Sequence, residues 1–192
     1  MHSGLAGGGK VNWGSIGAVQ AVQSKKLTTN ILSLDFFDRF GDAGITRGEG
    51  HIQGCVEEPY RDTIIHHRIQ ECMLVEDSED YSIFDDAERG EFIFHIFKRL
   101  VLGGGLNQWD DKTEPYLTAT KLLYKDLVHV AKDPKTKKIG VDSLVYEITD
   151  TTPGGMGGRL WGEDRTNNFC YLSIDSKKHT VSVWYHAALA QW

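Results

Sequence analysis

The feature that most constrains the fold is a long helical pattern that stops at three glycines. Between residues 88 and 101 the apolar side chains recur at the spacing of one helix face, and they are Ile93, Ile96, Phe97, Leu100 and Val101, with Phe92 and Phe94 widening the stripe. The polar residues on the other side are Glu88, Glu91, His95, Lys98 and Arg99. We therefore predict a helix over 88–101 that buries its apolar stripe, and we expect His95, on its polar side, to be solvated.

The glycines that follow, Gly103 to Gly105, invite comparison with a phosphate-binding loop. Such loops lie after a strand and before a helix, whose N-terminal amides face the anion. Here the order is reversed, because Gly103 follows the end of a helix, where unpaired carbonyls carry partial negative charge. The glycines are therefore predicted to end the helix rather than to bind phosphate.

Further elements are predicted on both sides of this helix. Residues 27–37 have the pattern of a strand that runs into a short amphipathic turn. Residues 57–75 begin with acids and a proline and are predicted to form a helix, with Ile65, Ile69, Cys72 and Met73 at helical spacing. Asp85 or Asp86 is expected to cap the helix that follows. Pro115 is expected to open another helix, over 115–127, with one face made by Tyr116, Thr120, Leu123 and Leu127.

The C-terminal half changes to a period of two, which is typical of strands. Residues 127–149 predict a hairpin that turns at Asp133 and Pro134. After a glycine-rich loop, residues 169–187 predict a second hairpin, with Cys170, Leu172 and Ile174 alternating on its first strand and Val181, Val183 and Tyr185 on its second. Helices first and strands last indicate an α+β fold, in which amphipathic helices pack on an antiparallel sheet formed largely by C-terminal hairpins. We expect a flexible Gly-rich tail over 1–18 and a single domain over 19–192.

Composition narrows the classes of function. The chain of 192 residues has 27 acidic and 21 basic residues and a net charge of -6, which disfavours a nucleic-acid partner. Its three cysteines lie far apart, so they make neither a disulfide framework nor paired metal knuckles. No apolar run approaches the roughly 20 residues that span a membrane. We expect a soluble intracellular protein that binds neither nucleic acid nor membrane.

Two small groups of residues could hold a metal ion. Asp110 and Asp111 supply hard oxygen ligands, but neighbouring residues point apart in regular structure, so solvated acids before a helix are the favoured interpretation. His67 and Glu71 are four residues apart on the predicted helix, but no HExxH motif or supporting Cys/His pair accompanies them. We expect no metal, cofactor or catalytic residue, and a metal-dependent enzyme using either pair remains the alternative.

A run of lysines marks the first predicted hairpin turn. Lys132, Lys135, Lys137 and Lys138 lie within seven residues, enough positive charge to attract an acidic protein surface or RNA. Such a turn is most often simply solvated, and no RNP-type aromatic motif accompanies it. An RNA-binding module acting through the turn of residues 132–138 is a second alternative.

One long block of the sequence resembles a known family. The segments LVEDSEDYSIF, EFIFHIFKRLVLGGGLNQW, PYLTATKLLYKDLV and DPKTKKI, in this order and spacing, resemble the cilia- and flagella-associated protein 300 family. The likeness extends more weakly through LSLDFFDRF and GHIQGC upstream and FCYLSID and VSVWYHA downstream, so that it spans residues 27–187. Members of the family carry a longer N-terminal region than the MHSGLAGGGKVNWG segment found here.

The resemblance implies a non-enzymatic protein of motile ciliated cells. It implies an adaptor or assembly factor that outer and inner dynein arms need for assembly in the cytoplasm or for intraflagellar transport into the cilium. The implied partners are dynein-arm assembly factors, axonemal dynein or the transport machinery, and the implied locations are the cytoplasm and the axoneme of the motile cilium or flagellum. Aromatic and charged side chains anchor interfaces, so the candidate protein-contact residues are Trp109, Asp110, Asp111, Lys135, Lys137 and Lys138.

Overall fold

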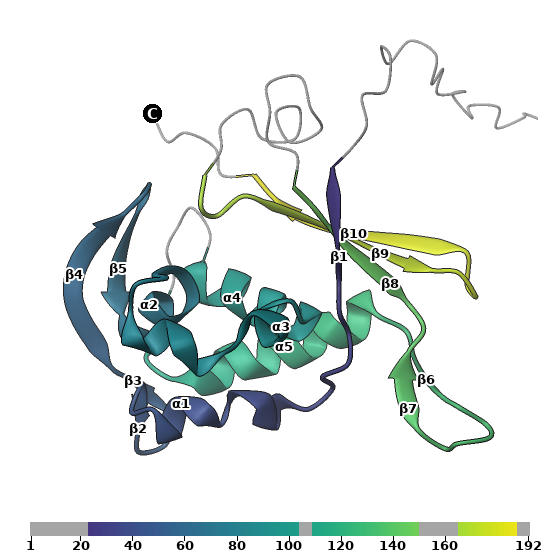
Figure 1. Cartoon of the computed structure of the whole chain (residues 1–192), viewed down its shortest axis with the longest axis horizontal. Coiled ribbons are helices and arrows are strands. Elements are labelled where there is room, and N and C mark those ends of the chain that lie inside the picture. The colour runs from purple at the N-terminus through teal and green to yellow at the C-terminus, as the bar shows by residue number, and fades with distance from the viewer. Residues whose placement is uncertain (1–22, 104–108, 150–164, 188–192) are drawn as a thin grey trace, which may run out of the picture.

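A layer of helices lies against one face of a four-stranded antiparallel sheet (Figure 1). The computed structural model describes residues 23–103, 109–149 and 165–187. The arrangement confirms the predicted α+β class. The predicted tail over 1–18, the glycine-rich loop over 151–159, and Gly104 and Gly105 lie outside the described residues. None of the helices in the described part is long and apolar enough to cross a membrane.

Helix α4 (Phe92–Leu102) lies at the centre of the helical layer and confirms the main helix prediction. The buried side chains come from most of its circumference, and they are Phe92, Ile93, Phe94, Ile96, Phe97, Val101 and Leu102. Gly103 ends the helix with φ 70°, a left-handed conformation that glycine adopts without steric cost, as the glycine cap requires.

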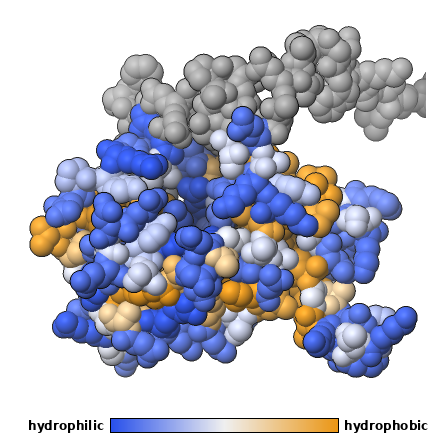
Figure 2. Space-filling view, in the orientation of Figure 1, coloured by the Kyte–Doolittle hydropathy of each residue, from blue (hydrophilic) through white to orange (hydrophobic). Residues whose placement is uncertain are grey.

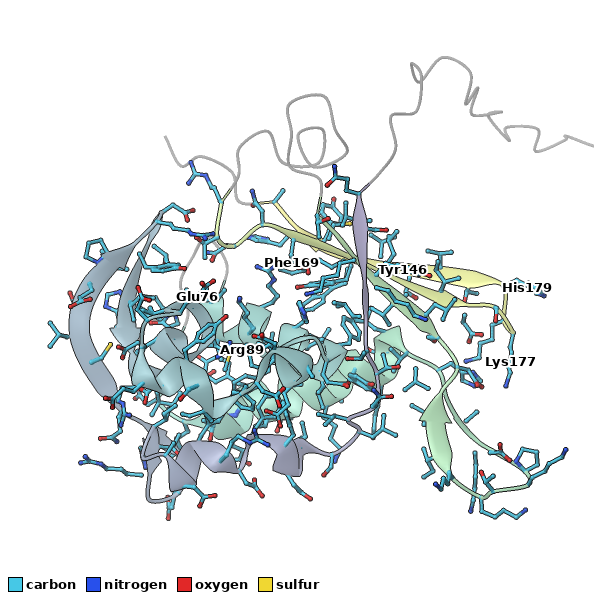
Figure 3. The ribbon with its side chains drawn as sticks, in the orientation of Figure 1. Glu76, Arg89, Tyr146, Phe169, Lys177 and His179 are labelled. Carbon is cyan, nitrogen blue, oxygen red and sulfur yellow. The ribbon has the colours of Figure 1, made fainter. Side chains whose placement is uncertain are left out.

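The observed helix begins at Phe92, four residues later than the predicted start at residue 88. A separate turn, α3 (Asp86–Arg89), precedes it, and Gly90 lies between the two. The side chain of Asp85 accepts a hydrogen bond of 2.8 Å from the backbone N–H of Glu88, so the predicted cap is confirmed, although it caps α3. Arg89, labelled in Figure 3, donates to the backbone carbonyls of Cys72, Tyr81 and Phe84 and thereby ties α3 to the segments before it.

Helix α5 (Thr113–Leu127) covers one side of α4, as the pattern after Pro115 predicts. The ring centroids of Phe97 and Tyr116 lie 6.3 Å apart, and those of Phe92 and Tyr124 lie 5.9 Å apart. Tyr116 and Thr120 of the predicted face are buried, whereas Leu123 and Leu127 are half-buried. Tyr124 was missing from the predicted face and is buried.

An aromatic cluster covers another side of α4. It comes from η2 (Leu34–Phe37) and α1 (Arg39–Asp42), where Phe37 lies 4.3 Å and Phe40 lies 5.4 Å from Phe97, measured between ring centroids. The strand predicted from Leu27 is wrong in its position, because β1 (Ser24–Leu27) ends there. Thr28 then exchanges backbone hydrogen bonds with Gly90 and Phe92, which redirect the chain towards the helices.

The single helix predicted over 57–75 is wrong. These residues form most of the hairpin of β4 (Gly54–Tyr60) and β5 (Thr63–His67), then the short helix α2 (Arg68–Leu74). The spacing of Ile65 and Ile69 fits a helix, but the β-branched run of Thr63 to Ile65 favours a strand, so Ile65 lies in β5 and only Ile69 lies in α2. Both side chains still reach the core. The remaining elements of this half are the strand pair β2 (Thr46–Arg47) and β3 (His51–Ile52), and η3 (Glu79–Ile83).

Both predicted C-terminal hairpins are present. Strands β6 (Val130–Lys132) and β7 (Ile139–Val141) pair as a separate ribbon. Strand β8 (Leu144–Ile148) joins β9 (Phe169–Asp175) and β10 (Thr180–His186) in the main sheet, whose order is β1-β8-β9-β10. Figure 1 shows the β6–β7 ribbon projecting beyond the sheet.

The two faces of the sheet have different surroundings. Tyr171 and Val145 lie on the face that packs on the helices and are almost fully buried. The register pairs Leu172 with Val183 and Ile174 with Val181, so the alternating apolar residues of the second hairpin share the opposite face. That face is turned away from the helical layer.

We predict that Phe97→Ala destabilises the fold by about 3–5 kcal/mol, because it removes a ring that α5 and the aromatic cluster both contact. Urea unfolding followed by circular dichroism measures the loss. Leu122→Ala, on the exposed side of α5, is the matched control and should change the free energy of unfolding by less than about 0.5 kcal/mol. Equal losses in the two variants would contradict the central position of α4.

Candidate functional site

The polar residues His95, Lys98 and Arg99 of α4 face the sheet, so the prediction that His95 is solvated is wrong. Arg99 donates from Nε to the Tyr171 hydroxyl at 2.9 Å, from Nη1 to the carbonyl of Thr166 at 3.0 Å, and from Nη2 to Glu147 at 3.3 Å. The sequence of α4 places its apolar and polar residues on different sides of the helix. Strands β8 and β9 supply polar partners for the polar side, so that side is also part of the interior.

His95 belongs to the same buried network. Its side chain is 12% exposed, and its Nδ1 lies 3.1 Å from the hydroxyl of Tyr171, which in turn donates to Glu147. Burial, reinforced by the neighbouring charge of Arg99, lowers the pKa of His95 to about 3. The imidazole is therefore neutral at pH 7, and it acts as a packing and hydrogen-bonding group rather than as a cation.

A cavity of about 390 Å³ opens beside this network. Its walls come from the turn between β4 and β5, from α4, from the end of β8 and from the start of β9, where Phe169 is labelled in Figure 3. Figure 2 shows a hydrophilic hollow between the β4–β5 hairpin and the sheet. The cavity is lined by four cationic side chains, Arg61, Lys98, Arg99 and Arg165, and by two carboxylates, Asp62 and Glu147.

Both carboxylates of the cavity have partners in its wall. Asp62 accepts hydrogen bonds from the backbone N–H of Thr166 at 3.0 Å and from its hydroxyl, which joins the β4–β5 turn to the start of β9. Although burial opposes it, this bonding holds the pKa of Asp62 below its usual value. Glu147 is held by Arg99 and Tyr171.

Lys98 differs from its neighbours in the cavity. Among the described residues its ammonium has no hydrogen bond and no ion pair, although Arg99 beside it has three donors engaged. Burial, followed by repulsion from Arg99, lowers the pKa of Lys98 to about 8. A half-buried cation that makes no hydrogen bond within the described residues costs free energy, so the ammonium of Lys98 is available to a ligand.

The structure brings Trp109 against the two histidines of β5. The ring centroids of Trp109 and His66 lie 4.7 Å apart, and those of Trp109 and His67 lie 6.2 Å apart. The indole is half-buried, whereas Asp110 and Asp111 are exposed. The carbonyl of Asp111 accepts from the N–H of Ile52 at 2.8 Å, so its backbone is fixed while its carboxylate is accessible.

The helix geometry expected for His67 and Glu71 is wrong. His67 is the last residue of β5, and the helix begins at Arg68, so the two do not lie one turn apart on a single helix. Burial and the adjacent His66 lower the pKa of His67. Throughout residues 23–103, 109–149 and 165–187, no three His, Cys, Asp or Glu side chains lie close enough together to hold a metal ion.

The lysine turn is exposed as a whole. Lys132, Lys135, Lys137 and Lys138 all lie on the β6–β7 hairpin and are open to solvent. The carboxylate of Asp133 accepts from the backbone N–H groups of Lys135 at 2.6 Å and Thr136 at 2.9 Å, as the predicted turn requires. The backbone of the turn is thus ordered by Asp133, while the lysine side chains are presented outward.

Comparison with known proteins identifies close relatives. A family model described as Cilia- and flagella-associated protein 300 matches residues 7–186. A protein of that name from Chlamydomonas reinhardtii is 34% identical over 183 residues, covering 94% of this chain and 71% of the relative. Another from Paramecium tetraurelia is 31% identical over 171 residues, covering 89% of this chain and 65% of the relative. The chain therefore spans about two thirds of each relative's length. No solved structure matches the chain.

Tyr171→Phe is predicted to destabilise the fold by about 1–3 kcal/mol, because Arg99 Nε loses its acceptor inside the protein. Thermal or urea unfolding measures the change. Tyr185→Phe, which removes the same hydroxyl on the exposed face, should leave stability unchanged. A Tyr171→Phe protein as stable as the original would show that the network contributes no net stability.

The depressed pKa of His95 predicts a specific acid sensitivity. Below its ordinary pKa of 6.5 the unfolded chain binds a proton at His95, whereas the folded chain does not until about pH 3, so stability falls as the pH falls through this window. We expect His95→Gln to lose less stability than the original chain between pH 6.5 and pH 4, measured by urea unfolding at each pH. The control His51→Gln, at an exposed histidine, should follow the original chain. A His95→Gln curve parallel to the original would refute the buried neutral imidazole.

Proposed function

The chain belongs to the cilia- and flagella-associated protein 300 family, and we propose that it is a non-enzymatic adaptor or assembly factor for axonemal dynein arms. Its family makes it a protein associated with cilia and flagella. The proposal adds that outer and inner arms depend on it for assembly in the cytoplasm, or for intraflagellar transport to the axoneme. Its support is the match of residues 7–186 to the family model, together with an exposed surface suited to another protein.

The observation that carries the proposal is the apolar outer face of the sheet. Val181, Val183 and Tyr185 are 60%, 55% and 58% exposed, and Leu144 on β8 is exposed beside them. Figure 2 shows apolar surface over β10, bordered by hydrophilic turn residues. Contiguous exposed apolar side chains mark protein-protein contact sites more often than chance surface does. We refer to these four residues as the outer apolar face.

Positive charge borders this face at one end. Lys177 and His179 lie in the β9–β10 turn (Figure 3), and Lys177 Nζ lies 2.6 Å from Asp142, which ties the turn to the β6–β7 hairpin. Lys135, Lys137 and Lys138 extend the charge along that hairpin. The surface therefore fits an amphipathic acidic segment of a dynein-arm assembly factor, with apolar side chains on the sheet and carboxylates towards the lysines.

Trp109, Asp110 and Asp111 form a second proposed contact. They lie beside the β5–α2 junction, on the opposite side of the molecule from the β6–β7 hairpin (Figure 1). An adaptor needs two surfaces that can be occupied together, and these two are far enough apart for that. We assign cargo or transport machinery to one surface and an assembly factor to the other.

We predict that Val183→Asp abolishes rescue of dynein arms in ciliated cells that lack the endogenous protein. The substitution places a carboxylate in the middle of the outer apolar face without reaching the core. Electron microscopy of axoneme cross-sections measures the arms, and the original chain should restore both outer and inner arms. Val56→Asp, at an exposed valine of β4, is the matched control and should restore them fully. Normal arms in cells that lack the protein altogether would sink the proposal.

Affinity purification from cells regrowing cilia identifies the partner. Dynein chains, assembly factors or transport-train subunits should co-purify with the original chain, and a triple Glu substitution of Lys135, Lys137 and Lys138 should reduce their yield about tenfold. Lys121→Glu with Lys125→Glu, on the exposed side of α5, serves as the charge control. Nuclease treatment before elution separates this result from RNA binding by the same lysines. Loss of the partners on nuclease treatment would support the RNA alternative.

A further inference from the structure

We propose that the cavity between the β4–β5 turn, α4 and the start of β9 binds a small phosphate-bearing molecule. The inference is independent of the adaptor role and concerns a different part of the protein. It rests on the cationic side chains that line the cavity, on the half-buried ammonium of Lys98 and on the apolar part of the wall.

The charge of the cavity is opposite to that of the chain. Among the described residues that line it, four side chains are cationic and two are anionic, in a protein whose net charge is -6. Both carboxylates already accept hydrogen bonds from the wall, Asp62 from Thr166 and Glu147 from Arg99 and Tyr171. In the part of the chain that the structure describes, neither carboxylate accepts a hydrogen bond from Lys98 or Arg61. Cationic side chains gathered around a hollow attract anions.

Lys98 supplies the strongest indication of a ligand. Its ammonium lines the cavity and, within the described residues, has no hydrogen-bond or ion-pair partner. A methionine of similar length would fill this position without the cost of desolvating a charge. An anion in the cavity gives the ammonium a partner with which it can form a charge-assisted hydrogen bond.

Two features favour a phosphate group with an organic body. Cations reach the cavity from two elements, Lys98 and Arg99 from α4 and Arg61 from the β4–β5 turn, which suits the several charged oxygens of a phosphate group. The volume of about 390 Å³ falls in the range of small-molecule sites and exceeds what one phosphate ion fills. Leu74, Ile148 and Phe169 provide an apolar wall for the remainder of the ligand.

The test is calorimetric titration of the full chain with phenyl phosphate, inorganic phosphate and benzoate at low ionic strength. Phenyl phosphate should bind saturably with one site per chain, more tightly than inorganic phosphate, which lacks the apolar body, and more tightly than benzoate, which has one negative charge. Binding should weaken as salt is added. The melting temperature should rise with phenyl phosphate concentration, as binding to the folded state requires.

Two variants remove cations without disturbing the fold. Lys98→Met should weaken phenyl phosphate binding about tenfold or more, while its stability in phosphate-free buffer equals or exceeds that of the original chain. If Lys98 served only to stabilise the fold, Lys98→Met would instead be less stable than the original chain. Arg61 has φ 52°, so Arg61→Gly keeps the turn conformation and removes a cation at the cavity rim, which should weaken binding a few-fold. Lys121→Met, at an exposed position of α5, is the control and should bind like the original chain.

The proposal is overturned if phenyl phosphate shows no saturable binding. It is also overturned if Lys98→Met binds phenyl phosphate as tightly as the original chain does, or if benzoate binds as tightly as phenyl phosphate.

Discussion

The burial of α4 on almost every side is the constraint on which the rest of the structure depends. A helix with phenylalanine at three of its first six positions cannot leave its surface to water, so each direction around it needs a covering element. Helix α5 supplies one cover through Tyr116 and Tyr124, and Phe37 and Phe40 supply another. The sheet supplies the third through Tyr171. Strands from both ends of the described chain must therefore meet over one helix, which explains why β1 pairs with β8 across a long sequence separation.

This arrangement also determines where the polar groups of α4 lie. His95, Lys98 and Arg99 come under the sheet because the helix is covered there, and Tyr171 and Glu147 return with β9 and β8 to meet them. Polar groups inside a protein need partners, and the partners of His95 and Arg99 come from strands more than 40 residues away in the sequence. Lys98 lies beyond the reach of these partners and faces the cavity. The outer side of the sheet does not cover α4, and it carries the exposed apolar residues of β10.

Sequence patterns predicted the elements whose signal is local. The stripe of α4, the cap at Gly103, the turn at Asp133 and the two C-terminal hairpins all depend on neighbours within a few residues, and all are present. The helix predicted over 57–75 failed because a spacing of four residues, as between Ile65 and Ile69, fits both a helix and a strand, and only the pairing of Ile65 with β4 shows that the helix begins later, at Arg68. The prediction that His95 is solvated failed because the sequence of a helix has the same polar pattern whether its polar side faces water or a buried tyrosine. The cavity was beyond prediction, since Arg61, Lys98 and Arg165 converge only after the β4–β5 turn is tied to Thr166.

One face of the sheet covers α4, and we propose that the opposite face binds a partner protein. Tyr171 lies on the inner face and is 1% exposed, whereas Tyr185, on the neighbouring strand, lies on the outer face and is 58% exposed. Hydroxyl-radical footprinting of the free chain and of the complex purified from cells regrowing cilia measures both residues in one experiment. The account predicts that Tyr171 is unreactive in both samples, and that Tyr185 is reactive in the free chain and protected in the complex. A Tyr185 that reacts equally in both samples would contradict it.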